Sequence, residues 1–170
     1  QFDLDIPLMI YSKHAIKLNY ARVKHFMQKY FDNYDILFSI KSNNTPPILS
    51  QLRSIGLHKL DACSPAEVRR ALQCGFETKD IQYTSPFISD RDFNDLIRFT
   101  DIAVNCDSIS MLKRFHNTDM GIRLDPLYGL SYKNHCKLQC SLSDTISKMG
   151  VQLDQLDDVL SVAKENNLKI

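Results

Sequence analysis

The sequence has 170 residues, and its 21 Lys and Arg residues nearly balance its 20 Asp and Glu residues, which gives a formal net charge of +1. With 44% hydrophobic residues the chain can bury a sizeable core, as an ordinary globular protein does. This charge balance gives no basic field, so nothing in it argues for nucleic acid or an anionic membrane surface as a partner, and we expect neither. The sequence shows no apolar run of about 18 residues, no signal peptide and no lipidation motif. Its five cysteines are scattered without a disulfide framework. We therefore expect a cytoplasmic protein with reduced thiols.

The first third of the chain predicts two strands, each followed by a helix. Residues 7–11 are apolar and predict a short strand, after which Ser12 is placed to cap a helix over about residues 13–31. Residues 36–40 form a second apolar, β-prone run bounded by turn-forming residues. We expect this run to be a strand buried on both faces in a parallel sheet. The helix after it begins with two prolines and ends at Gly56.

The same unit of strand and helix then repeats along the chain. Apolar runs predict strands, and apolar residues at helical spacing after Ser caps predict helices. The strands are predicted over residues 59–63, 81–84, 102–105 and 120–124, and the helices over about 65–74, 90–99, 109–115 and 153–166. Residues 168–170 predict the start of a further strand.

Helices between consecutive strands, with no hairpin signal, predict a parallel sheet covered by helices. Four of the units repeat at about 20 residues, and this regular spacing favours a (β/α)8 TIM barrel over an open doubly wound sheet. A complete barrel needs roughly 250 residues, so we expect an incomplete, amino-terminal portion of one. The longest stretch without periodicity, from residue 125 to residue 146, predicts a long loop.

Polar side chains follow the predicted strands at their carboxyl ends, which in a barrel meet at one mouth. They are Lys41, Asp61, Ser64, Ser85, Asn105, Asp107 and Arg123. Some of them have an ordinary structural alternative, because Ser64 and Ser108 are also placed to cap helices. Lys41 alone is compatible with a solvated residue after a strand, although a lysine amine at this place can also form a Schiff base.

Six sequence blocks occur in the order and spacing of a known family: FSIKSNN (38–44), LDACSPAEVRRALQCGF (60–76), IQYTSPFISD (81–90), VNCDS (104–108), GIRLDP (121–126) and SKMGV (147–151). With these blocks the chain resembles the amino-terminal half of the fold-type III pyridoxal-phosphate-dependent decarboxylases, which include diaminopimelate, ornithine, arginine and carboxynorspermidine decarboxylases. The resemblance implies an alanine-racemase-like (β/α)8 TIM barrel of the α/β class. Residues 12–170 would be a partial barrel that binds pyridoxal 5'-phosphate (PLP), and residues 1–11 a preceding strand that would join a β-domain.

The resemblance also implies roles for residues near the cofactor. Lys41 would be the catalytic lysine that holds PLP through a Schiff base. Asp61 and Arg123 would lie near the cofactor ring, where a pair formed by a carboxylate and a guanidinium would fix its orientation.

Three further cofactor-binding residues are implied with less specific roles. Asn43 matches a position that shapes the turn after the lysine, and Ser64 and Glu67 match positions at the start of the helix after the second barrel strand. Glu67 also has a purely structural alternative as the capping-box partner of Ser64. The run Ser147-Lys148-Met149-Gly150 matches a recurrent element whose role the sequence alone does not reveal.

The implied activity is the PLP-dependent decarboxylation of a basic amino acid, of the diaminopimelate, ornithine, lysine or arginine type, or of a carboxylated polyamine. By the same resemblance, a histidine that stacks on the cofactor, a Gly-rich phosphate-binding segment and an acidic residue for the pyridine nitrogen would follow residue 170. A second subunit of a homodimer would complete the site. We therefore expect this chain alone to be inactive.

Two other functional interpretations stay open. An alanine-racemase-like enzyme shares the barrel and the lysine, but there the lysine is followed by an Ala-Asp-Ala-Tyr-Gly-His type sequence rather than by Ser42-Asn43-Asn44. A non-catalytic regulatory homologue would keep the fold without the chemistry. A metal site is disfavoured, because His135, Cys136 and Cys140 offer three ligands in one loop where a structural zinc site needs about four.

Overall fold

The computed structural model of the chain describes residues 9–125 and 149–170. Five strands form one sheet in the order β1-β2-β3-β4-β5, and every neighbouring pair is parallel. The strands are β1 (Leu37–Ser39), β2 (Lys59–Ala62), β3 (Ile81–Ser85), β4 (Ala103–Cys106) and β5 (Gly121–Ile122). The α-helices are α1 (Lys13–Tyr30), α2 (Pro46–Ser54), α3 (Pro65–Gln73), α4 (Asp90–Leu96), α5 (Ile109–Leu112) and α6 (Leu156–Glu165). Short 3-10 turns are η1 (Ile40–Ser42), η2 (Thr78–Asp80) and η3 (Leu153–Gln155).

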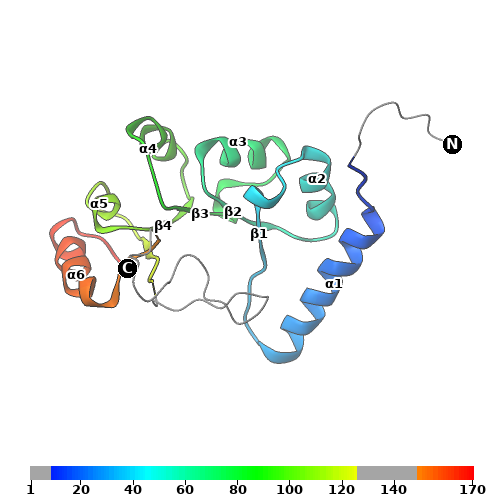
Figure 1. The fold of residues 1–170 in the computed structure, drawn as a ribbon, viewed down its shortest axis with the longest axis horizontal. Coiled ribbons are helices and arrows are strands. Elements are labelled where there is room, and N and C mark those ends of the chain that lie inside the picture. Colours follow the sequence, from blue (N-terminus) through cyan, green and yellow to red (C-terminus); the bar gives the residue numbers. More distant parts are fainter. Residues whose placement is uncertain (1–8, 126–148) are drawn as a thin grey trace.

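The order of the strands shows how the chain is wound. The connecting helices α2, α3, α4 and α5 follow one another around one side of the strands, and α6 lies beside α5 (Figure 1). A doubly wound sheet reverses its strand order at a switch point, whereas a barrel adds each strand beside the previous one. The strand order equals the chain order, so the prediction of a partial (β/α)8 barrel is confirmed.

The core lies between the sheet and its helices. In β3 the residues Ile81, Tyr83 and Ser85 are buried, whereas Gln82 and Thr84 are partly exposed. Because successive side chains of a strand point to opposite faces, one face of the sheet packs against the helices and the other faces the interior of the partial barrel. Fully buried side chains of the core include Ile40, Leu49, Leu60, Ile81, Leu96 and Leu112.

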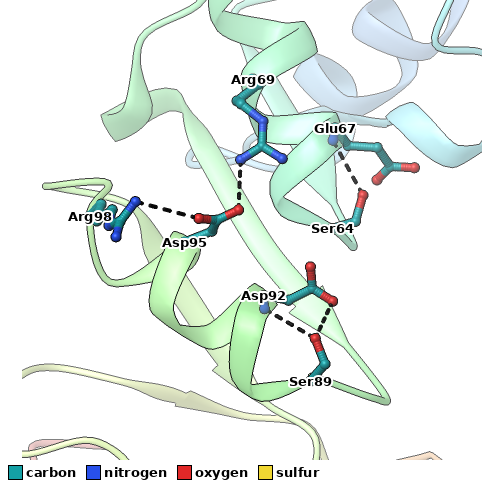
Figure 2. A network of polar contacts seen from close by, with 7 residues as sticks. All are labelled: Ser64, Glu67, Arg69, Ser89, Asp92, Asp95 and Arg98. Carbon is teal, nitrogen blue, oxygen red and sulfur yellow. Dashed lines mark hydrogen bonds and ion pairs between the residues drawn. The ribbon is translucent and has the colours of Figure 1, made fainter.

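Helices α3 and α4 also contact each other through charged side chains (Figure 2). Arg69 of α3 lies 3.1 Å from the Asp95 carboxylate of α4, and Arg98 lies 3.7 Å from the same carboxylate. Ion pairs with this much solvent exposure contribute at most about 1 kcal/mol each. The buried side chains of Val68 and Leu96 belong to the common core, and they stabilise the two helices more than the ion pairs do.

The amino-terminal predictions need two corrections. Of the strand predicted over residues 7–11, residues 9–11 are described and form no strand, while residues 7 and 8 lie outside the described residues. The strand predicted over residues 36–40 is shortened to β1, and its residues are half-buried instead of fully buried on both faces. The physical reason is that β1 stands at the end of the strand order and has a strand neighbour, β2, on one side.

Later elements differ from the prediction mainly at their ends. Helix α4 ends at Leu96 rather than near residue 99, because the chain turns there and reaches Asp101 in a left-handed conformation with φ 62°. Strand β5 is only two residues long. The strand predicted from residue 168 is a single parallel bridge between Asp119 and Lys169. Most of the loop predicted over residues 125–146 lies outside the described residues.

Helix α1 has the predicted apolar stripe, yet none of its residues is fully buried. Val23, Phe26 and Tyr30 are 49%, 57% and 58% exposed. Helix α1 is connected to the rest of the fold through Tyr20, whose hydroxyl donates a hydrogen bond to the carbonyl oxygen of Gly56 at 2.8 Å. The helical spacing of apolar residues therefore predicted which face of α1 is apolar, but it did not predict whether other residues of this chain bury that face.

Candidate functional site at the carboxyl edge of the sheet

Lys41 is the middle residue of η1, the turn that follows β1 directly. Its neighbour Ile40 is fully buried, and the N–H of Asn43 donates to the Ile40 carbonyl oxygen at 3.0 Å. The side-chain oxygen of Asn43 accepts a hydrogen bond from the N–H of Thr45, also at 3.0 Å. The turn is thus fixed on both sides of Lys41, while Lys41 itself is exposed at the carboxyl edge of the sheet.

Asp61 lies in β2, directly beside Ser39 of β1 in the parallel register. The Ser39 hydroxyl donates to the Asp61 carboxylate at 2.7 Å, which fixes the orientation of the carboxylate. Ser39 was not among the predicted site residues. Its contact depends on the register between two strands, which the sequence does not reveal.

Ser64 and Glu67 form the amino-terminal cap of α3 (Figure 2). The Ser64 hydroxyl oxygen accepts from the N–H of Glu67 at 3.2 Å, and the Glu67 carboxylate accepts from the N–H of Cys63 at 2.7 Å. Ser64 and Glu67 thus cap the helix nearly as a capping box does. The difference is that the Glu67 carboxylate accepts from the N–H of Cys63 and not from that of Ser64. Burial and the Glu67 carboxylate raise the pKa of the Cys63 thiol, and the charge of Lys41 acts in the opposite direction. The turn η1, which carries Lys41, packs against β2, the strand that leads into this cap.

Arg123 follows β5 and is held by a buried carboxylate. Its Nη1 atom lies 3.0 Å from Oδ1 of Asp107, whose side chain is 3% exposed, whereas the Arg123 side chain is 37% exposed. The other carboxylate oxygen of Asp107 accepts from the N–H of Gly150 at 2.9 Å. Gly150 belongs to the recurrent element noted in the sequence, so this contact supplies a role for that glycine.

The pairing of charges differs from the one expected from the resemblance. Among the described residues, Arg123 is paired with Asp107, and Asp61 is hydrogen-bonded to Ser39, so no direct pair between Asp61 and Arg123 is formed. The reason is topological: β5 and β2 are separated by two strands, whereas Asp107 follows the neighbouring strand β4.

Asn105 contributes a further polar contact on the interior face of the sheet. Its side-chain amide donates to the Thr84 hydroxyl of β3 at 3.0 Å. On the other side, a Cβ at Gly121 of β5 would lie 1.9 Å from the Asn105 side-chain oxygen, so a larger residue there would displace Asn105. Thr84 was not predicted, because threonine is common in strands. Gly121 was not predicted either, although a glycine within a strand often marks a close approach of another group.

Ser85 is the last residue of β3, at the carboxyl end where it was predicted, but its side chain does not lie on the interior face. It is buried, and its hydroxyl donates to the carbonyl oxygen of Phe87 at 2.5 Å. Since side chains alternate along β3, Ser85 faces the helices and Thr84 faces the interior.

Neither a metal-binding cluster nor a membrane-spanning helix is found in the described part of the chain. Residues 9–125 and 149–170 contain no group of three or more His, Cys, Asp or Glu side chains arranged to hold a metal ion. The candidate ligands His135, Cys136 and Cys140 lie outside these residues. Within the same ranges, no helix is both long and apolar enough to cross a membrane.

Comparison with known proteins places this arrangement in a family. Residues 18–170 match the family described as "Pyridoxal-dependent decarboxylase, pyridoxal binding domain". A diaminopimelate decarboxylase from Methanothermobacter thermautotrophicus is 25% identical over 164 residues, which are 94% of this chain and 37% of that protein. A lysine/ornithine decarboxylase from Selenomonas ruminantium is 23% identical over 162 residues, which are 95% of this chain and 38% of that protein. The chain thus spans about two fifths of the length of these curated relatives.

A solved structure supports the fold. A mutant of diaminopimelate decarboxylase from Helicobacter pylori, crystallised in complex with L-lysine, aligns with a TM-score of 0.80 at 22% identity. The alignment covers 98% of this chain and 43% of that one. The five parallel strands of this chain therefore match part of the fold of the Helicobacter pylori protein.

Proposed function

Because this chain belongs to the pyridoxal-dependent decarboxylase family and matches its pyridoxal binding domain, we propose that it supplies the lysine-bearing part of a PLP-dependent amino-acid decarboxylase. In this proposal Lys41 holds PLP through a Schiff base. The observation that carries the proposal is the exposed Lys41 side chain at the carboxyl edge of β1, the edge at which catalytic side chains collect in α/β barrels.

The side chains at this edge fit the cofactor by their chemistry. Lys41 offers a primary amine for an aldehyde, and the guanidinium of Arg123, held by Asp107, offers N–H donors for an anionic oxygen. The Asp61 carboxylate, held by Ser39, offers an acceptor of fixed orientation. Bound PLP would supply an electron sink for the negative charge left on the substrate when its carboxylate departs as carbon dioxide.

Each of these residues would have a separate task. The Nζ atom of Lys41 would hold the cofactor, and it would also be placed to donate a proton to the substrate carbon from which carbon dioxide has left. Asn43 would keep the Lys41 turn in shape through its contact with Thr45. Asp61 and Arg123 would orient the cofactor or the substrate. Their fixed geometry favours the reacting arrangement over others.

Ser64 and Glu67 would act on the cofactor site through the start of α3. Both are already engaged in the cap, where the Glu67 carboxylate holds the backbone of Cys63 at the end of β2, the strand that packs against the Lys41 turn. Their contribution is therefore to keep this stretch of backbone in place.

For the substrate we propose a basic amino acid, with a carboxylated polyamine as the alternative. The relatives named diaminopimelate and lysine/ornithine decarboxylases support this class. The chain spans about two fifths of those relatives, so we expect other residues to bind the phosphate and the pyridine nitrogen. We also propose that a homodimer completes the site and that this chain by itself is inactive.

Borohydride reduction tests the assignment of Lys41, because it converts a Schiff base into a stable secondary amine. The complete gene product that contains this sequence would be purified with PLP, reduced and digested. We expect mass spectrometry to find a pyridoxyl group on Lys41, and Lys41→Ala to lose both the label and the visible absorbance of the cofactor. Lys164→Ala, at another exposed lysine on α6, is the matched control and should keep both.

Other results would support other classes of protein. Absorbance and labelling that do not depend on Lys41 would support a non-catalytic homologue. With a basic amino acid as substrate, carbon dioxide release is expected; a change of chirality without gas release would support an alanine-racemase-like enzyme instead.

A further inference from the structure

Asp107 is a buried acidic residue to which the family resemblance gave no role. Its side chain is 3% exposed, and a carboxylate is costly to bury unless it is paired and hydrogen-bonded. Both of its oxygens have partners: Oδ1 lies 3.0 Å from Nη1 of Arg123, and Oδ2 accepts from the N–H of Gly150 at 2.9 Å. The cap of the following helix α5 is formed by Ser108, so Asp107 is not needed for that purpose.

The surroundings of Asp107 are poorly hydrated. The neighbouring Cys106 side chain is fully buried, and its pKa is raised to about 12 by burial and, second, by the charge of Asp107. In such surroundings an ion pair is screened less than at the surface. The contact between Asp107 and Arg123 is therefore a strong constraint on where the guanidinium lies.

Arg123 is fixed at its backbone as well. Its N–H donates to the carbonyl oxygen of Cys106 at 2.9 Å, and its carbonyl oxygen accepts from the N–H of Val151 at 2.8 Å. Gly150 allows the second contact, because it has φ +83° and a Cβ there would lie 3.0 Å from the Arg123 carbonyl oxygen. The glycine thus lets residues 149–151 approach β5 closely enough for the Gly150 N–H to reach Asp107.

We propose that Asp107 is a positioning residue of the decarboxylase site, which acts by holding the Arg123 guanidinium at the carboxyl edge of the sheet. A guanidinium has five N–H donors in a planar fork. One donor faces Asp107, and another faces the sulfur of Met149, a weak acceptor, at 2.9 Å. Arg123 is 37% exposed, so its fork can offer further donors to an anionic oxygen of the cofactor or substrate while Asp107 holds it from the buried side.

The inference rests on the proposed function, and a double-mutant cycle on the complete gene product tests it. The variants are Asp107→Asn, Arg123→Lys and both together. The readouts are the PLP dissociation constant and the pH titration of the visible absorbance of the resting protein, neither of which requires turnover. Asp119→Asn removes the same charge from an exposed pair with Lys169 and is the matched control.

We expect Asp107→Asn and Arg123→Lys each to weaken PLP binding by roughly tenfold, the effect of losing one charge-assisted hydrogen bond. The double variant should bind PLP within about twofold of Arg123→Lys alone, because Asp107 acts only through the guanidinium, which Arg123→Lys already lacks. Both single variants should shift the absorbance titration in the same direction. Asp119→Asn should leave both readouts unchanged.

Two results would overturn the inference. One is a double variant in which the two effects multiply, since Asp107 would then act independently of Arg123. The other is an Asp107→Asn protein with lowered thermal stability but with the PLP binding and the absorbance titration of the wild type. That result would show that Asp107 has a structural role only. If Asp107→Asn does not fold, Asp107→Glu, which keeps the charge on a longer side chain, goes through the same cycle. A wild-type protein without Lys41-dependent absorbance would contradict the proposed function itself, which is a separate result.

Discussion

At the scale of single residues, Gly150 and Gly56 share a left-handed backbone but have very different surroundings. Their φ angles are +83° and +93°, yet a Cβ at Gly150 would lie 2.8 Å from the Asp125 nitrogen, whereas a Cβ at Gly56 would meet nothing within 4 Å. We expect Gly56→Ala to cost about 1 kcal/mol for the strained backbone. Gly150→Ala should cost about 1–3 kcal/mol more, because backbone atoms must also move. Urea unfolding curves of both variants measure this, and equal losses would contradict it.

The buried thiol of Cys106 predicts how stability changes in alkaline solution. Burial, with a further contribution from Asp107, raises its pKa from 9.0 to about 12. In the unfolded chain the thiol has its ordinary pKa, so above that pH unfolding releases a proton and the unfolded state is favoured. This stabilisation is complete below pH 9.0 and is lost as the pH rises toward 12.

We therefore expect the melting temperature to fall as the pH is raised from about 9. Cys106→Ala should be less stable than the wild type at neutral pH, because it leaves a cavity, but should show a shallower alkaline decline. Tyr83, whose pKa is also raised to about 12 by burial, contributes to the decline in both proteins. Parallel curves for the two proteins would show that Cys106 does not titrate in this way.

The site residues that could be predicted are those whose place depends on local sequence. Lys41 and Asp61 could be placed at strand ends, because short apolar runs in the sequence predict where strands begin and end. The contacts that hold these residues in place could not be predicted from the sequence. The contact between Ser39 and Asp61 spans 22 residues and that between Asp107 and Arg123 spans 16, so both depend on strand register.

At the scale of elements, the caps of α3 and α4 provide a matched pair for separating stability from cofactor binding (Figure 2). Ser64 accepts from the N–H of Glu67 at 3.2 Å, and Ser89 accepts from the N–H of Asp92 at 3.1 Å. Replacing either serine with alanine should cost about 1 kcal/mol of stability. Only the Ser64→Ala variant should also weaken PLP binding, because its cap directly follows β2, the strand that packs against the Lys41 turn η1. Equal PLP binding by both variants would limit Ser64 to a structural role.

Most elements could be predicted because their signals are local and agree with one another. The Ser-x-x-Glu cap of α3 and the glycines at positions 56 and 75, both with positive φ, mark helix starts and stops within a few residues. The early end of α4 and the two-residue β5 could not be predicted in this way. Helix α4 has no glycine at its carboxyl end, and the length of β5 follows from its pairing with Asn105 and Cys106 of β4, which is a tertiary contact.

At the scale of the whole molecule, the sheet and α1 leave uncovered surface at the same end of the fold. Among the described residues, β1 has a strand neighbour on one side, and the α1 side chains of Val23 and Phe26 are 49% and 57% exposed. Unpaired strand edges and exposed apolar patches promote association. We expect the 170-residue chain expressed alone to self-associate, as measured by sedimentation velocity.

A surface variant checks the cause of this association. Val23→Ser combined with Phe26→Ser should reduce it without unfolding the protein, since both side chains are about half exposed and contribute little to the core. A chain that is monomeric at all accessible concentrations would show that the uncovered face is tolerated in water.

The strand order also has a consequence for how the protein is made. Each strand pairs with the next one along the chain, and the pairs from Ser39 to Asp61 and from Thr84 to Asn105 are only 22 and 21 residues apart. Closing loops of this length costs less entropy than pairing strands that lie farther apart in the chain. Chains leave the ribosome at about 5–20 residues per second, so each unit has time to dock before the next one emerges. The edge that carries Lys41 can therefore assemble before the strand that precedes Arg123 has been synthesised.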